Sequence, residues 1–185
     1  MAKHFGVSPR KKTGGLKLTR ENYITVNPKS SFTQGAYHDK EYCEKHIEAC
    51  KRNFDLNMNF FSHLSHEDFE SKLEIFLSNH KGFYEINDLK AVSKVSGYYL
   101  MVLDEYCQAY IGTSSDIKSR IMRHWAKTKE FDRLIFGNVE NSILSVDSFR
   151  ALDTTRIFVM PSEDIYSLEN TFVIDFPENE KYLLN

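Results

Sequence analysis

Arg120 and His124 lie four residues apart in a segment with helical periodicity, so a helix would place both side chains on one face. An arginine is always charged and can hold a phosphate through two parallel hydrogen bonds. A histidine beside it can donate a hydrogen bond or move a proton near neutral pH. The pair therefore indicates chemistry on a phosphate, although an ordinary solvent-facing polar helix would have the same spacing.

A second set of candidate ligands consists of cysteines and histidines. Cys43, His46 and Cys50 fall along one predicted helix, and His63 and His66 follow it. Three ligands on one continuous helix, without a turn between them, do not match the usual geometry of zinc sites. Small apolar cysteines on a core-facing stripe explain this pattern better.

The elements that must position the Arg-His pair begin with two β-type runs. Residues 98–103 and 107–111 are dense in aliphatic and aromatic side chains and flank a short polar turn, which predicts a β-hairpin. A Ser-Ser-Asp sequence at 114–116 precedes apolar residues at every fourth position. This pattern predicts a capped helix that carries the pair.

The rest of the C-terminal half predicts one more strand and one more helix. Residues 130–153 have a mixed pattern, with a candidate strand at 143–146. Residues 154–160 are β-rich, and residues 165–176 predict a last helix that stops at Pro177. The order of elements predicts an α+β fold, in which helices flank a small antiparallel three-stranded sheet.

The N-terminal half carries a different pattern. Residues 1–36 contain Pro, Gly-Gly and many basic residues without helical periodicity, and we expect them to form a flexible arm. Residues 37–95 predict a mostly helical extension, with helices beginning near Asp39, at 65–79 and at 87–95.

Length and composition fit one globular domain with an arm, because 185 residues with 41% hydrophobic residues can bury a core. No apolar run is long enough to cross a membrane, and three cysteines favour a reducing, cytoplasmic setting. The net charge of −2 alone argues against a nucleic-acid partner. However, residues 1–30 hold seven Lys and Arg against one acid, whereas residues 161–185 hold one Lys against six acids. A basic arm of this kind suits either phosphate binding or a solvated terminus.

The ends of the predicted hairpin strongly resemble the two signatures of the GIY-YIG nuclease family. Gly97-Tyr98-Tyr99 opens the first strand, with Tyr in place of the usual Ile, and Tyr110-Ile111-Gly112 closes the second. The aliphatic residue, arginine and histidine of the family pattern follow in order. Glu169 lies where the family has a glutamate, and Pro177-Glu178-Asn179 resembles the family's ending. The resemblance covers residues 97–179, a little under half of the chain.

The resemblance implies metal-dependent hydrolysis of a DNA phosphodiester. Tyr99 and Tyr110 match the signature tyrosines, one of which contacts or deprotonates the attacking water. Arg120 matches the arginine that stabilises the reacting phosphate, and His124 matches a position that often assists. Glu169 matches the sole protein ligand of one divalent cation, Mg²⁺ or Mn²⁺. An ordinary tyrosine has a pKa of ~10, so a tyrosine base would need help from the cation or the arginine.

Basic residues around the Arg-His helix suit a DNA backbone track. We expect Lys118, Arg123 and Lys127 to contact DNA there, and the resemblance adds Asn179. Acidic residues interrupt this cluster, so a salt-bridged surface helix fits the same residues.

The sequence thus predicts a cytoplasmic endonuclease that favours duplex DNA, makes no membrane contact and could act as a dimer. Its nuclease-like domain would span residues 96–185, with an insertion at about 130–153. Two alternatives stay open: a non-catalytic module of the same fold that binds nucleic acid or protein, and a nuclease directed at RNA.

Overall fold

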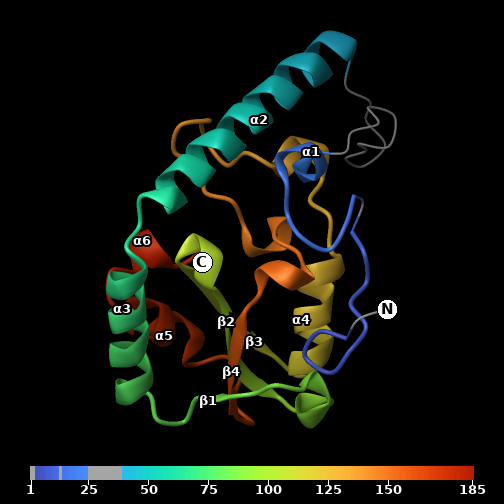
Figure 1. Cartoon of the computed structure of the whole chain (residues 1–185). Coiled ribbons are helices and arrows are strands. Elements are labelled where there is room, and N and C mark those ends of the chain that lie inside the picture. The colour runs from blue at the N-terminus through green and yellow to red at the C-terminus, as the bar shows by residue number, and fades with distance from the viewer. Residues whose placement is uncertain (1–2, 13, 25–38) are drawn as a thin grey trace.

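An antiparallel sheet of four strands lies at the centre of the molecule, in the order β1-β4-β2-β3 (Figure 1). The computed structural model describes residues 3–12, 14–24 and 39–185. The strands are β1 (Tyr84–Glu85), β2 (Gly97–Leu103), β3 (Gln108–Ser114) and β4 (Arg156–Pro161). The α+β prediction is confirmed, but the prediction of three strands is wrong. The additional strand, β1, has only two residues, too few to show the alternation that marks a strand in sequence.

Strand β2 is the most deeply buried strand, because β3 and β4 pair with it on either side and helices cover both of its faces. Its side chains alternate between two clusters, as the strand period requires. Tyr99, Met101 and Leu103 join one core, and Tyr98, Leu100 and Val102 join the other. Burial on both faces explains why this strand reads as an uninterrupted apolar run.

Six α-helices surround the sheet in the described part of the chain. They are α1 (Arg20–Tyr23), α2 (Lys40–Ser62), α3 (His66–Asn79), α4 (Ile117–Ala126), α5 (Glu169–Asp175) and α6 (Asn179–Tyr182). Helix α4 and the N-terminal segment cover one face of the sheet, and α3, α5 and α6 cover the other (Figure 1). No helix within residues 3–12, 14–24 and 39–185 is long and apolar enough to cross a membrane.

Side-chain caps explain where three of these helices begin. Asp39, Ser65 and Asp116 each accept a hydrogen bond from a backbone N–H of the first turn of α2, α3 and α4, respectively. The predicted helices near Asp39 and at 65–79 are confirmed, as is the capped helix that carries Arg120 and His124.

Three predicted elements differ from the structure. The helix predicted at 165–176 begins only at Glu169, because the Asp164 carboxylate accepts the N–H groups of Tyr166 and Ser167 and holds a separate turn. The helix predicted at 87–95 is a short 3-10 turn, η1 (Leu89–Val92). Residues 143–146 form no strand, and most of the 130–153 segment is irregular.

Helix α2 holds the irregular 130–153 segment in place. The Asn53 amide donates hydrogen bonds of 2.7 Å to the backbone carbonyls of Val139 and Ser142. The Asn57 side chain accepts the N–H of Leu144 at 3.1 Å. Both asparagines are buried, so they satisfy loop groups that would otherwise be buried without partners. The helical extension is therefore built into the same unit as the sheet.

The described part of the N-terminal segment packs against the body of the protein. Val7, Leu18, Tyr23 and Ile24 are buried in the same core as Tyr99. Arg20 pairs with Asp55 on α2 at 2.7 Å. The expectation of a flexible arm at 1–36 is therefore wrong for residues 3–12 and 14–24, and residues 25–36 lie outside the described residues. The sequence did not predict this packing, because the apolar residues of this segment show neither helical nor strand periodicity.

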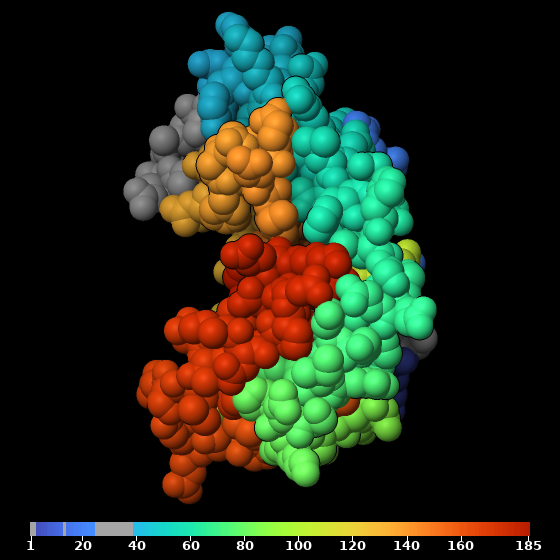
Figure 2. Space-filling model, turned by 90° about the vertical axis from the view of Figure 1, so that its left-hand side faces the viewer, coloured from blue at the N-terminus to red at the C-terminus, as the bar shows by residue number. Residues whose placement is uncertain are grey.

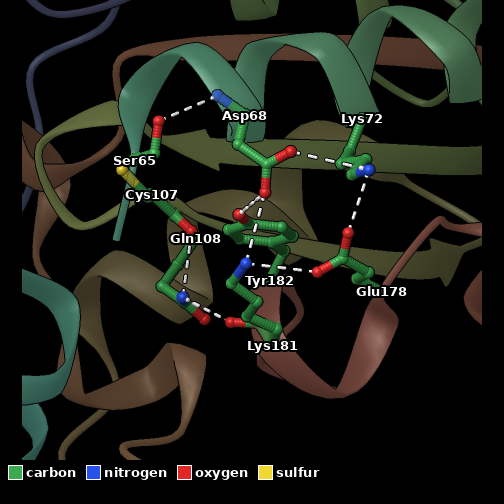
Figure 3. Close-up of polar contacts among 8 residues, drawn as sticks. All are labelled: Ser65, Asp68, Lys72, Cys107, Gln108, Glu178, Lys181 and Tyr182. Atoms are coloured by element: carbon green, nitrogen blue, oxygen red, sulfur yellow. Dashed lines mark hydrogen bonds and ion pairs between the residues drawn. The ribbon is translucent and has the colours of Figure 1, made fainter. Parts of the chain in front are cut away.

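A network of charged side chains joins α3 to the C-terminal helix α6 (Figure 3). Asp68 accepts a short hydrogen bond from the Tyr182 hydroxyl, and Lys181 lies 3.2 Å from the same carboxylate. Lys72 bridges Glu178 at 2.9 Å. The network fastens the C-terminal end of the chain to α3 and so helps to hold α5 and α6 over the sheet.

We expect this network to make the stability of the protein sensitive to acid. The Tyr182 hydroxyl and the Lys181 ammonium hold the pKa of Asp68 below its usual range. A depressed pKa in the folded state stabilises the protein above the unfolded pKa of about 4, and this contribution is lost as pH falls through the folded value. We expect Asp68→Asn to lower the melting temperature at neutral pH and to make its decline in acid shallower.

Thermal unfolding between neutral and acidic pH measures this effect. Glu67→Gln is the matched control on the same helix, since Glu67 forms no ion pair within the described residues. An Asp68→Asn curve that parallels wild type at every pH would contradict the assignment.

Candidate active site

Tyr99 and Gly112 lie opposite each other in the β2–β3 hairpin. A Cβ added to Gly112 would come within 2.4 Å of the Tyr99 hydroxyl oxygen and 2.9 Å of the Tyr110 ring. Only glycine therefore leaves room for the two tyrosines, whose ring centres are 6.2 Å apart. The strand pairing thus brings Tyr99 and Tyr110 together over one glycine.

His124 lies behind Tyr99, on helix α4. Its Nε2 is 2.8 Å from the Tyr99 hydroxyl, and its ring centre is 5.2 Å from that of Tyr110. Its Nδ1 is 2.7 Å from Oδ1 of Asp147. Burial lowers the pKa of His124, although the Asp147 carboxylate opposes that shift.

Arg120 lies one helical turn before His124, half-buried and next to both tyrosines. Burial raises the pKa of Tyr99 and of Tyr110, and hydrogen bonding with the charged Arg120 counteracts the rise in each. The Nε atom of Arg120 is buried and has no hydrogen-bond partner within the described residues. A buried, unpaired donor on a cation is costly, while the partial exposure of Arg120 as a whole leaves its guanidinium able to meet an anionic ligand.

Glu169 is the first residue of α5, which lies on the face of the sheet opposite α4. The turn before it is fixed by the hairpin. The Tyr98 hydroxyl accepts the N–H of Leu168 at 3.2 Å, and the Thr113 hydroxyl donates to the carbonyl of Ile165 at 2.8 Å. These bonds set the position of the Glu169 backbone relative to the tyrosines.

The Glu169 carboxylate is half-buried and forms no hydrogen bond or ion pair within the part of the chain that the structure describes. Burial raises its pKa, and the charge of Arg120 counteracts the rise. The Glu169 charge in turn raises the pKa of Tyr110. Tyr99, Tyr110 and His124 thus contact one another through their rings, and electrostatic interactions link Arg120 and Glu169 to the two tyrosines, so that the five residues form one cluster.

The residues predicted to contact DNA lie in different parts of the structure. Arg123 is exposed and Lys118 is half-buried on α4. Lys127 forms an ion pair with Asp147 at 3.1 Å. The Asn179 amide donates to the carbonyl of Val173 at 2.8 Å, so it fastens α6 to α5 rather than joining the five clustered residues.

Asn179 also lines a groove on the surface. The groove runs between the irregular segment around residues 136–145 and the C-terminal residues 179–185. Figure 2 shows it as the notch between the orange segment and the red C-terminal region. Val173 lies in its wall one helical turn after Glu169, so helix α5 connects the groove to the five clustered residues.

Asp147 is the site residue that the sequence did not reveal. It lies 23 residues after His124, in the 3-10 turn η4 (Val146–Ser148) of the irregular segment. It is buried, and it also pairs with Lys129 at 3.1 Å. No periodic pattern connects an irregular segment to a helix face, so only the folded chain shows this contact.

Metal-ligand chemistry at the site rests on one carboxylate. Within the described residues, no group of three or more His, Cys, Asp and Glu could hold a metal ion. The cysteines of the alternative zinc pattern, Cys43 and Cys50, are buried in the core. His46 contacts the carbonyl oxygen of Phe131 at 2.6 Å.

Comparison with known proteins adds no relative. No protein-family model, no curated protein and no solved structure matches this chain. Any functional conclusion therefore rests on the residues and their geometry.

Proposed function

We propose that this protein is a metal-dependent endonuclease that hydrolyses DNA phosphodiester bonds through a site of the GIY-YIG type. The convergence of Tyr99, Tyr110, Arg120, His124 and Glu169 from four separate elements carries the proposal. Surface packing alone does not explain why two tyrosines, a cation and a carboxylate without a partner in the described residues lie together.

Arg120 would bind the reacting phosphate. Its unpaired Nε donor and partial burial favour an anionic ligand with oxygen acceptors. A guanidinium in a partly desolvated position stabilises the additional negative charge of the transition state more strongly than one in water.

Tyr110, which keeps partial exposure, would contact the attacking water, and the buried Tyr99 would act behind it. Burial raises the pKa of the Tyr99 hydroxyl, so this tyrosine alone is a weak base at neutral pH. His124, 2.8 Å away, would accept the tyrosine proton when its imidazole is neutral.

Glu169 would hold a single divalent cation, Mg²⁺ or Mn²⁺. Its half-buried carboxylate without a protein partner fits such an ion, because Mg²⁺ accepts one protein carboxylate together with water and substrate oxygens. When bound, the cation would polarise the phosphoryl group and stabilise the leaving oxygen.

Substrate binding would use the outer face of α4. Arg123 is exposed there and forms no ion pair within the described residues. Lys127 has an exposed side chain even though it contacts Asp147. The net charge of −2 is consistent with modest non-specific affinity for DNA. We propose duplex DNA as the favoured substrate and a cytoplasmic location.

A cleavage assay on a panel of substrates tests the proposal. Purified protein is incubated with supercoiled plasmid, linear duplex, single-stranded DNA and RNA, each with Mg²⁺, with Mn²⁺ or with chelator. We expect metal-dependent nicking of the DNA substrates. Cleavage of RNA alone would support an RNA-directed nuclease, and binding without cleavage of any substrate would support a non-catalytic module.

A further inference from the structure

A chain of polar contacts leads from Tyr99 into the interior of the protein. The Tyr99 hydroxyl contacts His124 Nε2 at 2.8 Å, and His124 Nδ1 contacts Asp147 Oδ1 at 2.7 Å. The other oxygen of Asp147 lies 3.1 Å from both the Lys127 and the Lys129 ammonium groups. Both the histidine and the aspartate are buried, at 4% and 6% exposure.

The contacts of Asp147 keep it ionised. Burial alone would raise the pKa of this carboxyl, but its hydrogen bond and electrostatic interaction with His124 and its contacts with Lys129 and Lys127 outweigh burial and hold the pKa far below its usual range. An ionised carboxylate can only accept hydrogen bonds. His124 Nδ1 must therefore carry the hydrogen in the contact with Asp147.

The tautomer of His124 then decides the direction of its second hydrogen bond. When the imidazole is neutral, hydrogen on Nδ1 leaves a lone pair on Nε2, to which the Tyr99 hydroxyl would donate. If the tyrosine proton moves, the Tyr99 O–H bond breaks and an Nε2–H bond forms on His124. The resulting imidazolium would face the Asp147 carboxylate, and the phenolate would face Arg120.

The backbone around Asp147 is also fixed. The Lys12 ammonium donates a short hydrogen bond to the carbonyl of Asp147 and a 2.8 Å bond to that of Phe149. The Ser145 hydroxyl accepts the N–H of Asp147 at 3.2 Å. The N-terminal segment and the irregular 130–153 segment thus meet at the backbone of Asp147.

We propose that Asp147 is a positioning residue that holds His124 in the tautomer able to accept the proton of Tyr99. The proposal rests on the proposed nuclease function, since it assigns Asp147 to that reaction. Asp147 touches neither substrate nor metal in this account and acts only through His124.

Asp147→Asn tests the proposal, because it keeps the shape of the side chain and removes the charge. The asparagine amide can donate to Nδ1, which would move the histidine hydrogen to Nε2 and turn it toward Tyr99. We expect kcat to fall by up to roughly 10⁴-fold, the loss typical when the aspartate of a catalytic Asp–His pair becomes asparagine, with little change in KM. Asp147→Glu should restore part of the loss.

A double-mutant cycle with His124→Gln separates positioning from general destabilisation. If Asp147 acts only through His124, adding Asp147→Asn to the His124→Gln protein should change kcat by less than about 3-fold. Equal losses in both backgrounds would overturn the proposal. Asp153→Asn is the matched control, because Asp153 is buried in the same segment and bonds Tyr106 rather than His124. It should lower stability and leave the kcat of the folded protein unchanged.

A spectroscopic readout keeps the inference testable without turnover. Long-range ¹H–¹⁵N correlation spectra of the full-length, ¹⁵N-histidine-labelled protein show which ring nitrogen of His124 is protonated at neutral pH. We expect hydrogen on Nδ1 in the wild type. Hydrogen on Nε2 in the wild type would overturn the proposal even if the Asn variant failed to fold, and it would leave the proposed nuclease function standing.

Discussion

Replacing Arg120 with alanine is expected to slow DNA cleavage by roughly 10²–10³-fold at saturating DNA and Mg²⁺, the usual loss when one donor to a developing anion is removed. The guanidinium lies beside both tyrosines, and its buried Nε donor has no protein partner in the described part of the chain. Its removal therefore takes away charge at the reacting phosphate. Arg120→Lys should recover little of the rate, because an ammonium cannot reproduce the planar, two-donor contact.

Single-turnover cleavage of a plasmid measures this loss. Arg123→Ala is the matched control, since Arg123 lies on the same helix but is exposed. We expect this control to weaken DNA binding and to lower the slope of log affinity against log salt by about 1. The cleavage rate at saturating DNA should not change. An Arg120→Ala protein that cleaves at the wild-type rate would remove Arg120 from the proposed reaction.

Gly112→Ala is expected to be the most damaging single-methyl change at the site. The new Cβ would lie 2.4 Å from the Tyr99 oxygen, 2.5 Å from its Cζ and 2.9 Å from the Tyr110 ring, so both rings must shift. Overpacking of this kind costs about 1–3 kcal/mol of stability. A displacement of reacting groups by about 1 Å can cost roughly 100-fold in rate. We therefore expect a folded but severely impaired enzyme.

Gly82→Ala separates the loss of stability from the displacement of the tyrosines. Its Cβ would also be crowded, at 2.6 Å from the Met160 sulfur, but it does not touch the tyrosines. Chemical denaturation and cleavage kinetics on both variants give the comparison. If Gly112→Ala loses no more activity than Gly82→Ala, the position of the tyrosines does not matter for turnover.

The hairpin and the helix after it could be predicted from sequence because each carries a local signal. Residues 97–114 contain dense β-type runs around a turn, and Asp116 caps a helix with an apolar seam. The five residues that cluster at the candidate site all lie on these elements or on α5. Their positions therefore follow from strand register and helical period.

The rest of the site could not be predicted, because tertiary contacts rather than local pattern hold it. Asp147 reaches His124 from a segment without regular structure, and Lys12 reaches the same turn from more than a hundred residues away. Strand β1 and the packed N-terminal segment depend in the same way on partners distant in the chain. Residues 1–30 are strongly basic, but fewer of their basic side chains are available to bind a ligand than the sequence suggests. Lys12, Lys17 and Arg20 bind protein groups instead.

The proposed nuclease function depends on Glu169 as the residue that enables metal-dependent cleavage within this cluster. The most direct test is the initial rate of plasmid nicking by wild-type and Glu169→Gln proteins across a titration of Mg²⁺. Glutamine keeps the size of the side chain and removes the charge that a divalent cation needs. We expect the wild-type rate to rise with Mg²⁺ to a plateau and the Glu169→Gln protein to show no cleavage at any Mg²⁺ concentration. Equal Mg²⁺-dependent rates for the two proteins would contradict it.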